Sequence, residues 1–146
     1  MGADYGPVGR LRTIPDRLRA AAYVDLRHDI GSTTLVASTG RSGSTWMAEL
    51  LNHRNDHRLV FEPFRPERVR KARPFRWGLY IDPDDQDHPL APLIDELLAG
   101  RVRSWWTDRQ NHRLVASRRI VKEIRITNLL PWIRRRHPRL PIVYVV

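Results

Sequence analysis

The 146-residue sequence contains no cysteine, and this absence excludes disulfide bonds, thiolate catalysis and metal sites with cysteine ligands. Long apolar runs are also lacking, because the longest, at 140–146, is far shorter than the ~20 residues that span a bilayer. The first residues, MGADYGPVGR, hold no apolar signal-peptide core, and Gly6 stands where a myristoylation motif has Ser or Thr. These absences predict a cytoplasmic protein without a membrane anchor.

Lysine is nearly absent as well. Lys71 and Lys122 are the only lysines among 26 basic residues, and the rest are arginines. The formal net charge of +10 favours anionic partners, and arginine suits fork-like recognition of phosphate and sulfate oxygens. A GC-rich genome also raises arginine content through its codons. The charge by itself therefore identifies no ligand and leaves nucleic acid among the candidates.

Apolar and polar residues follow one another in a way that predicts strands and helices in turn. Strands are expected at 33–38, 59–64, 119–125 and 140–146, the last of them buried on both faces. Helices are expected at 14–26, 44–52, 89–98, 101–109 and 127–136, with Thr127 as the cap of the last one. This alternation predicts an α/β fold with a P-loop-like, mainly parallel sheet flanked by helices.

The same pattern divides the chain into a basic leader at 1–31 and one α/β domain at 32–146. Within the domain, 65–88 is rich in Pro, Arg and Asp and is predicted to be an irregular insertion. The sequence ends inside the apolar run IVYVV, with no turn or polar tail after it. We therefore expect a chain truncated after its fourth strand and only marginally folded, because that strand lacks a covering helix.

The sequence STGRSGSTW at 38–46 places two of the chain's glycines among hydroxyl residues and an arginine. A strand, a glycine-rich loop and a helix form an anion cradle, because backbone N–H groups and the positive end of the helix converge on the ligand. The triphosphate-binding form of this loop is G-x-x-x-x-G-K-[ST]. Aligned on Gly43, the present loop has Ser38 for the first glycine and Ser44 for the lysine, while its charge lies at Arg41. The loop thus fits an anion with less charge than the tail of ATP.

The segment GRSGSTW resembles the 5′-phosphosulfate-binding loop of sulfotransferases that use 3′-phosphoadenosine 5′-phosphosulfate (PAPS), which reads P-K-S-G-T-T-W in the cytosolic branch. Arg41 stands at the lysine of that motif, and the residues that follow in its order are Ser42, Gly43, Ser44, Thr45 and Trp46. The stretch at 121–146 is similar to the middle of bacterial and carbohydrate sulfotransferases, where a lysine-bearing strand, a helix and an apolar strand follow one another. The resemblance covers roughly 32–64 and 119–146.

The resemblance implies transfer of a sulfuryl group from PAPS to a hydroxyl or amine of a carbohydrate or small-molecule acceptor, without a metal. It implies that 41–46 bind the cofactor and that Arg41 also supplies charge during transfer. Trp46 either stacks near the adenine, as in the cytosolic branch, or belongs to the core. The family's residues for the 3′-phosphate would lie beyond Val146, so the 146-residue chain alone is expected to be inactive.

Two further residues complete the predicted catalytic site. Glu62 lies in the apolar stretch LVFEPF, where burial would raise its pKa and favour proton acceptance. Several carbohydrate sulfotransferases place a glutamate base after the second strand, and the alternative is an ion pair with Arg65 or Arg68. Lys122 matches a strand lysine that contacts the transferring group in cytosolic relatives, although a solvent-exposed lysine fits the sequence as well. Ile124 occupies the position of the histidine base in those relatives, which moves that role to Glu62.

The remaining polar clusters show no ligand pattern. The six histidines lack metal-ligand spacing, and the acidic run at 82–87 lacks the glycine and the final glutamate of a calcium loop. Trp105 and Trp106 fit either an acceptor pocket or the core. Two other functions stay open. One is a P-loop nucleotide kinase or NTPase, which requires the missing lysine and a magnesium-binding aspartate, and the other is a nucleic-acid-binding module that uses the arginines.

Overall fold

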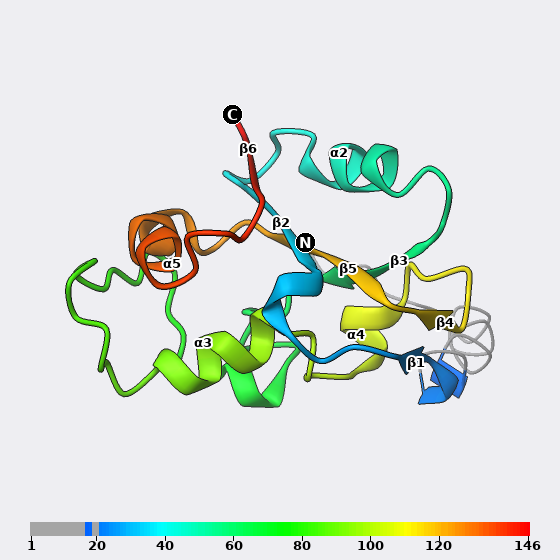
Figure 1. Cartoon of the computed structure of the whole chain (residues 1–146), viewed down its shortest axis with the longest axis horizontal. Coiled ribbons are helices and arrows are strands. Elements are labelled where there is room, and N and C mark those ends of the chain that lie inside the picture. Colours follow the sequence, from blue (N-terminus) through cyan, green and yellow to red (C-terminus); the bar gives the residue numbers. More distant parts are fainter. Residues whose placement is uncertain (1–16, 19–20) are drawn as a thin grey trace.

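The computed structural model describes residues 17–18 and 21–146, and its main feature is a sheet of four parallel strands (Figure 1). The strands are β2 (Thr33–Ser38), β3 (His57–Phe61), β5 (Arg118–Glu123) and β6 (Ile142–Val145), in the spatial order β3-β5-β2-β6. A smaller parallel sheet pairs β1 (Val24–Asp25) with β4 (Val115–Ala116). The predicted α/β fold with a parallel sheet flanked by helices is confirmed.

Helices cover both faces of the main sheet. They are α2 (Ser44–Leu51), α3 (Ala91–Leu98), α4 (Trp105–Asp108) and α5 (Leu130–Arg136), with 3₁₀ turns η1 (Ile30–Ser32), η2 (Arg70–Ala72) and η3 (Thr127–Leu129). Side chains alternate between the faces of a strand, so Val36 packs with Ala48 of α2 while Leu35 packs with α3 and α5 on the other face. Figure 1 shows α2 above the sheet and α3 and α4 below it. Among the described residues, no helix is long and apolar enough to cross a bilayer.

Two of the predicted helices begin later than expected. The prediction at 101–109 is wrong in its first half, because α4 begins only after Ser104, whose Oγ accepts a hydrogen bond from the Thr107 N–H at 3.1 Å. Thr127 is not a helix cap. It is the first residue of the 3₁₀ turn η3, and its Oγ1 donates to the Ser38 carbonyl at 3.4 Å. Both differences arise from contacts that the helical spacing of apolar residues does not encode.

The ends of the chain also differ from expectation. Of the predicted helix at 14–26, residues 14–16 and 19–20 lie outside the described residues, 21–22 are helical, and Val24–Asp25 form β1 instead. Tyr23 and Asp25, in the predicted leader, are buried. The expectation that the strand at 140–146 is buried on both faces is wrong in the described structure, because β6 is at the edge of the sheet and Tyr144 is 45% exposed.

The segment at 65–88 is irregular, as predicted, with η2 as the only helical turn among its residues. It is nevertheless packed. Phe75 meets Phe64 edge to face at 4.9 Å, and Val69, Ala72 and Ile81 are buried in the larger core. This segment therefore has a fixed position beside the sheet, which matters for the cavity described below.

Four charged side chains are buried together near the amino ends of β3 and β5. Arg58 and Arg119 are paired in register on these strands and are fully buried. Asp25 Oδ2 accepts from Arg58 Nη1 and from Arg119 Nε, each at 3.1 Å. Asp108 Oδ1 accepts from Arg58 Nε at 2.7 Å, and the Gly100 carbonyl accepts from Arg58 Nη1 at 2.6 Å. This cluster fastens β1 and α4 to the main sheet.

Candidate functional site

The connections of the sheet single out one place on its edge. The segment after β2 leads to α2 on one face, whereas the segment after the neighbouring strand β5 leads to α5 on the other face. Adjacent parallel strands whose connections leave in this way open a crevice between their carboxyl ends, and α/β proteins bind ligands at such topological switch points. The crevice lies between the end of β2 at Ser38 and the end of β5 at Glu123.

The loop after β2 has a backbone shape that suits an anion. Gly43 adopts a φ of +81°, a left-handed conformation that favours glycine, and α2 begins directly after it. Arg41, which carries a side chain, is also left-handed at φ +66°, and strain of this kind concentrates at ligand sites. Ser42 Oγ donates to the Thr39 carbonyl at 2.9 Å. A Cβ added at Gly40 would meet no atom within 4 Å, so the space beside the loop is open.

Ser38 contributes a feature that the sequence did not reveal. Its side chain is buried, and its Oγ has no hydrogen-bond partner among the described residues. Strand alternation places Ser38 on the same face of β2 as Val36, which is the face that α2 covers. Five buried polar side-chain atoms lack a partner among the described residues, and Ser38 Oγ is the one at the end of β2, where it is available to a ligand of the loop.

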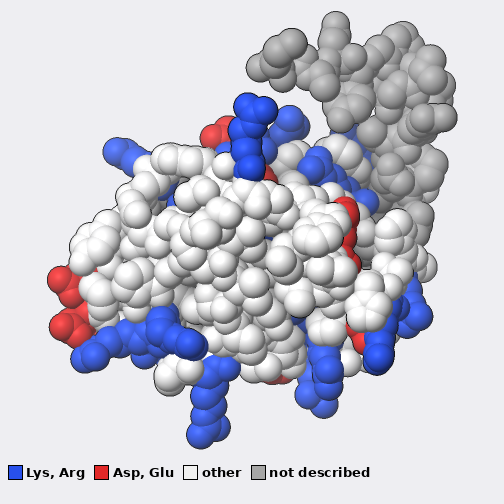
Figure 2. Space-filling view, turned by 90° about the horizontal axis from the view of Figure 1, so that it is seen from above, with Lys and Arg blue, Asp and Glu red and all other residues white. Residues whose placement is uncertain are grey.

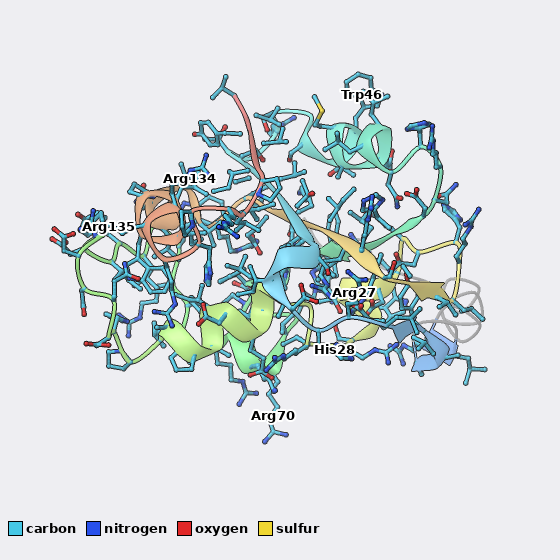
Figure 3. The ribbon with its side chains drawn as sticks, viewed as in Figure 1. Arg27, His28, Trp46, Arg70, Arg134 and Arg135 are labelled. Carbon is cyan, nitrogen blue, oxygen red and sulfur yellow. The ribbon has the colours of Figure 1, made fainter. Side chains whose placement is uncertain are left out.

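The other predicted loop residues differ in exposure. Arg41 is exposed, Ser44 is buried at the start of α2, and Thr45 is half-buried. Trp46 is 63% exposed and lies on the outer side of α2, away from the sheet (Figure 3). The interpretation of Trp46 as a core residue is therefore wrong, and stacking near an adenine stays a prediction.

Glu62 and Lys122, the two predicted catalytic residues, meet at the ends of β3 and β5. Lys122 Nζ donates to Glu62 Oε1 at 2.8 Å, and the two side chains are 5% and 6% exposed. Arg65 Nη1 and Arg125 Nη1 donate to Glu62 Oε2 at 3.2 and 3.4 Å. The alternative of a solvent-exposed Lys122 is thus wrong, whereas the alternative ion pair between Glu62 and Arg65 is present.

The pKa of Glu62 is shifted in the direction opposite to the one expected. Burial works to raise the pKa of Glu62, but the hydrogen bond from Lys122 and the charges of Lys122, Arg125 and Arg65 outweigh it. The pKa of Glu62 is therefore lowered, opposite to the direction predicted from its apolar neighbours. Glu62 also has a φ of +43°, which turns the chain and ends β3 at Phe61 instead of Phe64.

Glu123 is a residue of this edge that sequence reasoning missed. Its side chain is fully buried, and Oε2 accepts from the Phe64 N–H at 2.8 Å. Oε1 accepts from the N–H groups of Ile124 and Arg125 at 2.9 and 3.1 Å. Burial raises the pKa of Glu123 to about 7, although these N–H donors act in the opposite direction. The only signal in the sequence is a second charged residue beside Lys122 in an apolar strand. The carboxyl group ties the turn after β3 to the turn after β5.

A cavity of about 220 Å³ opens at the same crevice. Its walls come from three segments: the loop after β2, the turn after β5 and the irregular segment. The lining residues are Thr39, Gly40, Trp77, Gly78, Ile124, Arg125, Thr127 and Asn128. The loop at 39–43, called the anion loop below, and the turn that carries Arg125 therefore face a common space.

Three further features of the sequence can be placed: its metal-ligating residue types, the Trp105–Trp106 pair and its many arginines. Across residues 17–18 and 21–146, no group of three or more metal-ligating side chains lies together. Trp106 is a core residue that meets Phe61 edge to face at 5.4 Å, and Trp105 packs partly buried against the same core. On the face shown in Figure 2, Lys and Arg lie around the rim and the centre is uncharged. Among the described residues on that face, the basic side chains are separated from one another and form no continuous strip of the kind that follows a nucleic-acid backbone.

Comparison of the chain with protein-family models, with curated proteins and with solved structures finds no match. The resemblance to sulfotransferases therefore stays a prediction from the residues of the chain itself.

Proposed function

We propose that this chain binds the 5′-phosphosulfate group of PAPS at the loop between β2 and α2, and that this loop, Lys122 and Glu62 are its contribution to transfer of the sulfuryl group to a hydroxyl or amine of an acceptor. One observation carries the proposal: a glycine-shaped, hydroxyl-rich loop without the triphosphate lysine lies at the switch point, after the strand that pairs with β5, and β5 carries the buried Lys122. Lys122 is in register with Val36 of β2, whose side chain lies on the face that α2 covers. The Lys122 side chain therefore leaves the sheet on the same face as α2, and its ammonium group contacts Glu62.

The residues present fit such a group. The first turn of α2 leaves backbone N–H groups without helical partners, and the positive end of the helix dipole lies at Ser44. The buried Ser38 Oγ lacks a partner among the described residues, and the space next to Gly40 is open. An oxyanion in this loop would receive hydrogen bonds that the chain does not use internally.

Each residue has a defined role in the proposed reaction. PAPS, when bound, would supply the sulfuryl group and leave as adenosine 3′,5′-bisphosphate, and Arg41 and Lys122 would supply positive charge. The loop N–H groups and the hydroxyl groups of Ser44 and Thr45 donate hydrogen bonds, so that catalysis consists of positioning and electrostatic stabilisation. Glu62 accepts the proton of the acceptor. Its lowered pKa keeps it ionised at neutral pH, which a general base requires, although it also reduces its basicity.

A nucleotide kinase or NTPase is less well supported by the same edge. Ser44 stands at the position of the triphosphate-binding lysine. The acid at the end of β5 is Glu123, and both of its oxygens accept backbone N–H groups. A carboxylate bound in this way is poorly placed to hold a magnesium ion.

Calorimetric titration of the chain with PAPS, adenosine 3′,5′-bisphosphate and ATP with magnesium tests the proposal. We expect both adenosine 3′-phosphate compounds to bind more tightly than ATP with magnesium. Arg41→Ala should weaken their binding by ~1–3 kcal/mol, or roughly 5- to 150-fold, the scale of a hydrogen bond to a charged group. Arg54→Ala, which removes an exposed arginine beyond the other end of α2, is the matched control. Preference for ATP with magnesium, or equal effects of the two variants, would overturn the proposal.

A further inference from the structure

The cavity next to the anion loop contains a side chain that the proposed reaction does not use. Trp77 is 66% exposed, although tryptophan is on average a highly buried residue. It lines the cavity of about 220 Å³ at the crevice between β2 and β5. The packed, irregular segment at 65–88 thus presents a large aromatic ring at the place where the topology favours a ligand.

Two contacts hold Trp77 in this exposed position. The guanidinium of Arg125 lies over its ring, 5.1 Å from the ring centroid. The next residue, Gly78, has a φ of +75°, and its carbonyl accepts a hydrogen bond from Asn128 Nδ2 at 3.1 Å. Arg125 and Asn128 both follow β5 and line the same cavity. The indole is therefore fastened to the turn after β5, which is the turn that Glu123 holds.

Arg125 connects this ring to the predicted reacting groups. Its Nη1 donates to Glu62 Oε2 at 3.4 Å, and Glu62 Oε1 accepts from Lys122 Nζ at 2.8 Å. A molecule lying on Trp77 is thus separated by one side chain from the proposed base and the proposed sulfuryl site. A molecule in this position would correspond to the acceptor of the proposed reaction, and not to the phosphosulfate group of the cofactor.

The lining of the cavity favours one kind of acceptor. Its lining includes the polar residues Thr39, Thr127, Asn128 and Arg125, with Ile124 as the one aliphatic side chain. Thr127 Oγ1 and Asn128 Nδ2 donate to the Ser38 and Gly78 carbonyls, so these two residues offer their oxygens as acceptors. A single aromatic surface beside several hydrogen-bonding groups suits a ring with an apolar C–H face and a hydroxylated edge. A nucleobase or a phenol has two apolar faces and would gain more from two apolar walls. The volume of about 220 Å³ leaves room for one six-membered ring.

We propose that Trp77, together with Arg125 and Asn128, forms a subsite that binds one hydroxylated six-membered ring with its C–H face against the indole. The role of this ring as the sulfuryl acceptor rests on the proposed function. Binding of the ring itself does not depend on sulfuryl transfer, so the two can be tested separately.

NMR titration of the indole N–H signals of the five tryptophans tests the subsite. The probes are methyl β-glucopyranoside, phenol and adenosine 3′,5′-bisphosphate, and Trp77→Phe assigns the signal while keeping an aromatic face. We expect the glucoside to shift the Trp77 signal with a millimolar dissociation constant. Followed by the backbone amide signals of Arg125 and Asn128, Trp77→Ala should weaken glucoside binding roughly fivefold or more, and Trp77→Phe should retain most of it. The matched control is Tyr80→Ala, because Tyr80 is an exposed aromatic residue of the same segment and is not among the residues that line the cavity.

Three results would overturn the subsite. They are no Trp77 shift with the glucoside, a shift with phenol but not with the glucoside, and a loss of bisphosphate affinity in Trp77→Ala that matches the loss of glucoside affinity. The last of these would assign Trp77 to the nucleotide. If the glucoside shifts Trp77 in a chain that does not bind the bisphosphate, the proposed function fails and the ring subsite stands.

Discussion

Asp25 neutralises two buried arginines at once, and replacing it by asparagine is expected to be strongly destabilising. Its carboxylate accepts from Arg58 Nη1 at 3.1 Å and from Arg119 Nε and Nη2 at 3.1 and 3.2 Å. All three side chains are fully buried in these ion pairs. In Asp25→Asn, Arg119 keeps only the neutral partners Thr33 Oγ1 and the Asp29 carbonyl, while Arg58 keeps Asp108.

The magnitude follows from the charge left behind. Removing one partner of a buried ion pair leaves an uncompensated charge in the core, which costs ~3–5 kcal/mol. Total stabilities of single domains are ~5–15 kcal/mol, so Asp25→Asn should lower the free energy of unfolding by a large fraction. Urea denaturation at pH 7, followed by tryptophan fluorescence, measures this difference.

The matched control is an exposed ion pair. Arg135 Nη2 lies 2.9 Å from Asp84 Oδ1, with side chains 64% and 77% exposed, so Asp84→Asn should leave the free energy of unfolding nearly unchanged. A destabilisation by Asp25→Asn below ~1 kcal/mol would refute the reasoning that the buried cluster fastens β1 to the sheet, because a buried charge cannot be left unpaired at so small a cost.

Two further predictions concern the carboxyl edge of the sheet. The pKa of Glu123 is about 7 in the folded chain, against an ordinary 4.5 in the unfolded chain. Below pH ~4.5 the carboxyl group is protonated in both states and its contribution to the free energy of unfolding is complete. As pH rises to 7 the unfolded chain ionises first, and up to ~3 kcal/mol of that contribution is lost. The free energy of unfolding of the chain minus that of Glu123→Gln should therefore fall between pH 5 and pH 8, and a constant difference would contradict the assignment. Gly43→Ala should lower the free energy of unfolding by ~1–2 kcal/mol, measured by thermal or urea unfolding, because a Cβ is unfavourable at φ +81°. Gly40→Ala should leave the free energy of unfolding unchanged, because Gly40 is outside that conformation and an added Cβ would meet no close atom. Equal stability of the two variants would contradict the loop geometry.

The strand and helix on either side of the anion loop could be predicted because their local signals agree. The β-branched run at 33–38, the glycine before Ser44 and the helical spacing after it all indicate the same boundaries, and β2 and α2 match them within one residue. The switch point could not be predicted in the same way. It depends on the strand order β3-β5-β2-β6, which is a property of the whole sheet.

The pKa of Glu62, the predicted base, depends on residues that are distant along the chain. Local apolar neighbours suggested a raised pKa for Glu62, but Lys122 and Arg125, 60 and 63 residues away along the chain, lower it. The late beginning of α4, within the helix predicted at 101–109, has a similar origin. The carbonyls of Gly100 and Val102 accept hydrogen bonds from Arg58, which holds this stretch in a non-helical course until Ser104 caps α4. Long-range polar contacts, which leave no periodic trace in the sequence, decided both cases.

The most direct test of the central claim is to map where adenosine 3′,5′-bisphosphate binds. The amide signals of the chain are followed by NMR during titration with this compound, and ATP with magnesium is then added as a competitor. We predict that the largest shifts fall on the amides of 40–45, with smaller ones at Lys122, and that ATP with magnesium does not displace the bisphosphate. Shifts confined to other parts of the chain, no shifts at all, or displacement by ATP with magnesium would contradict the account.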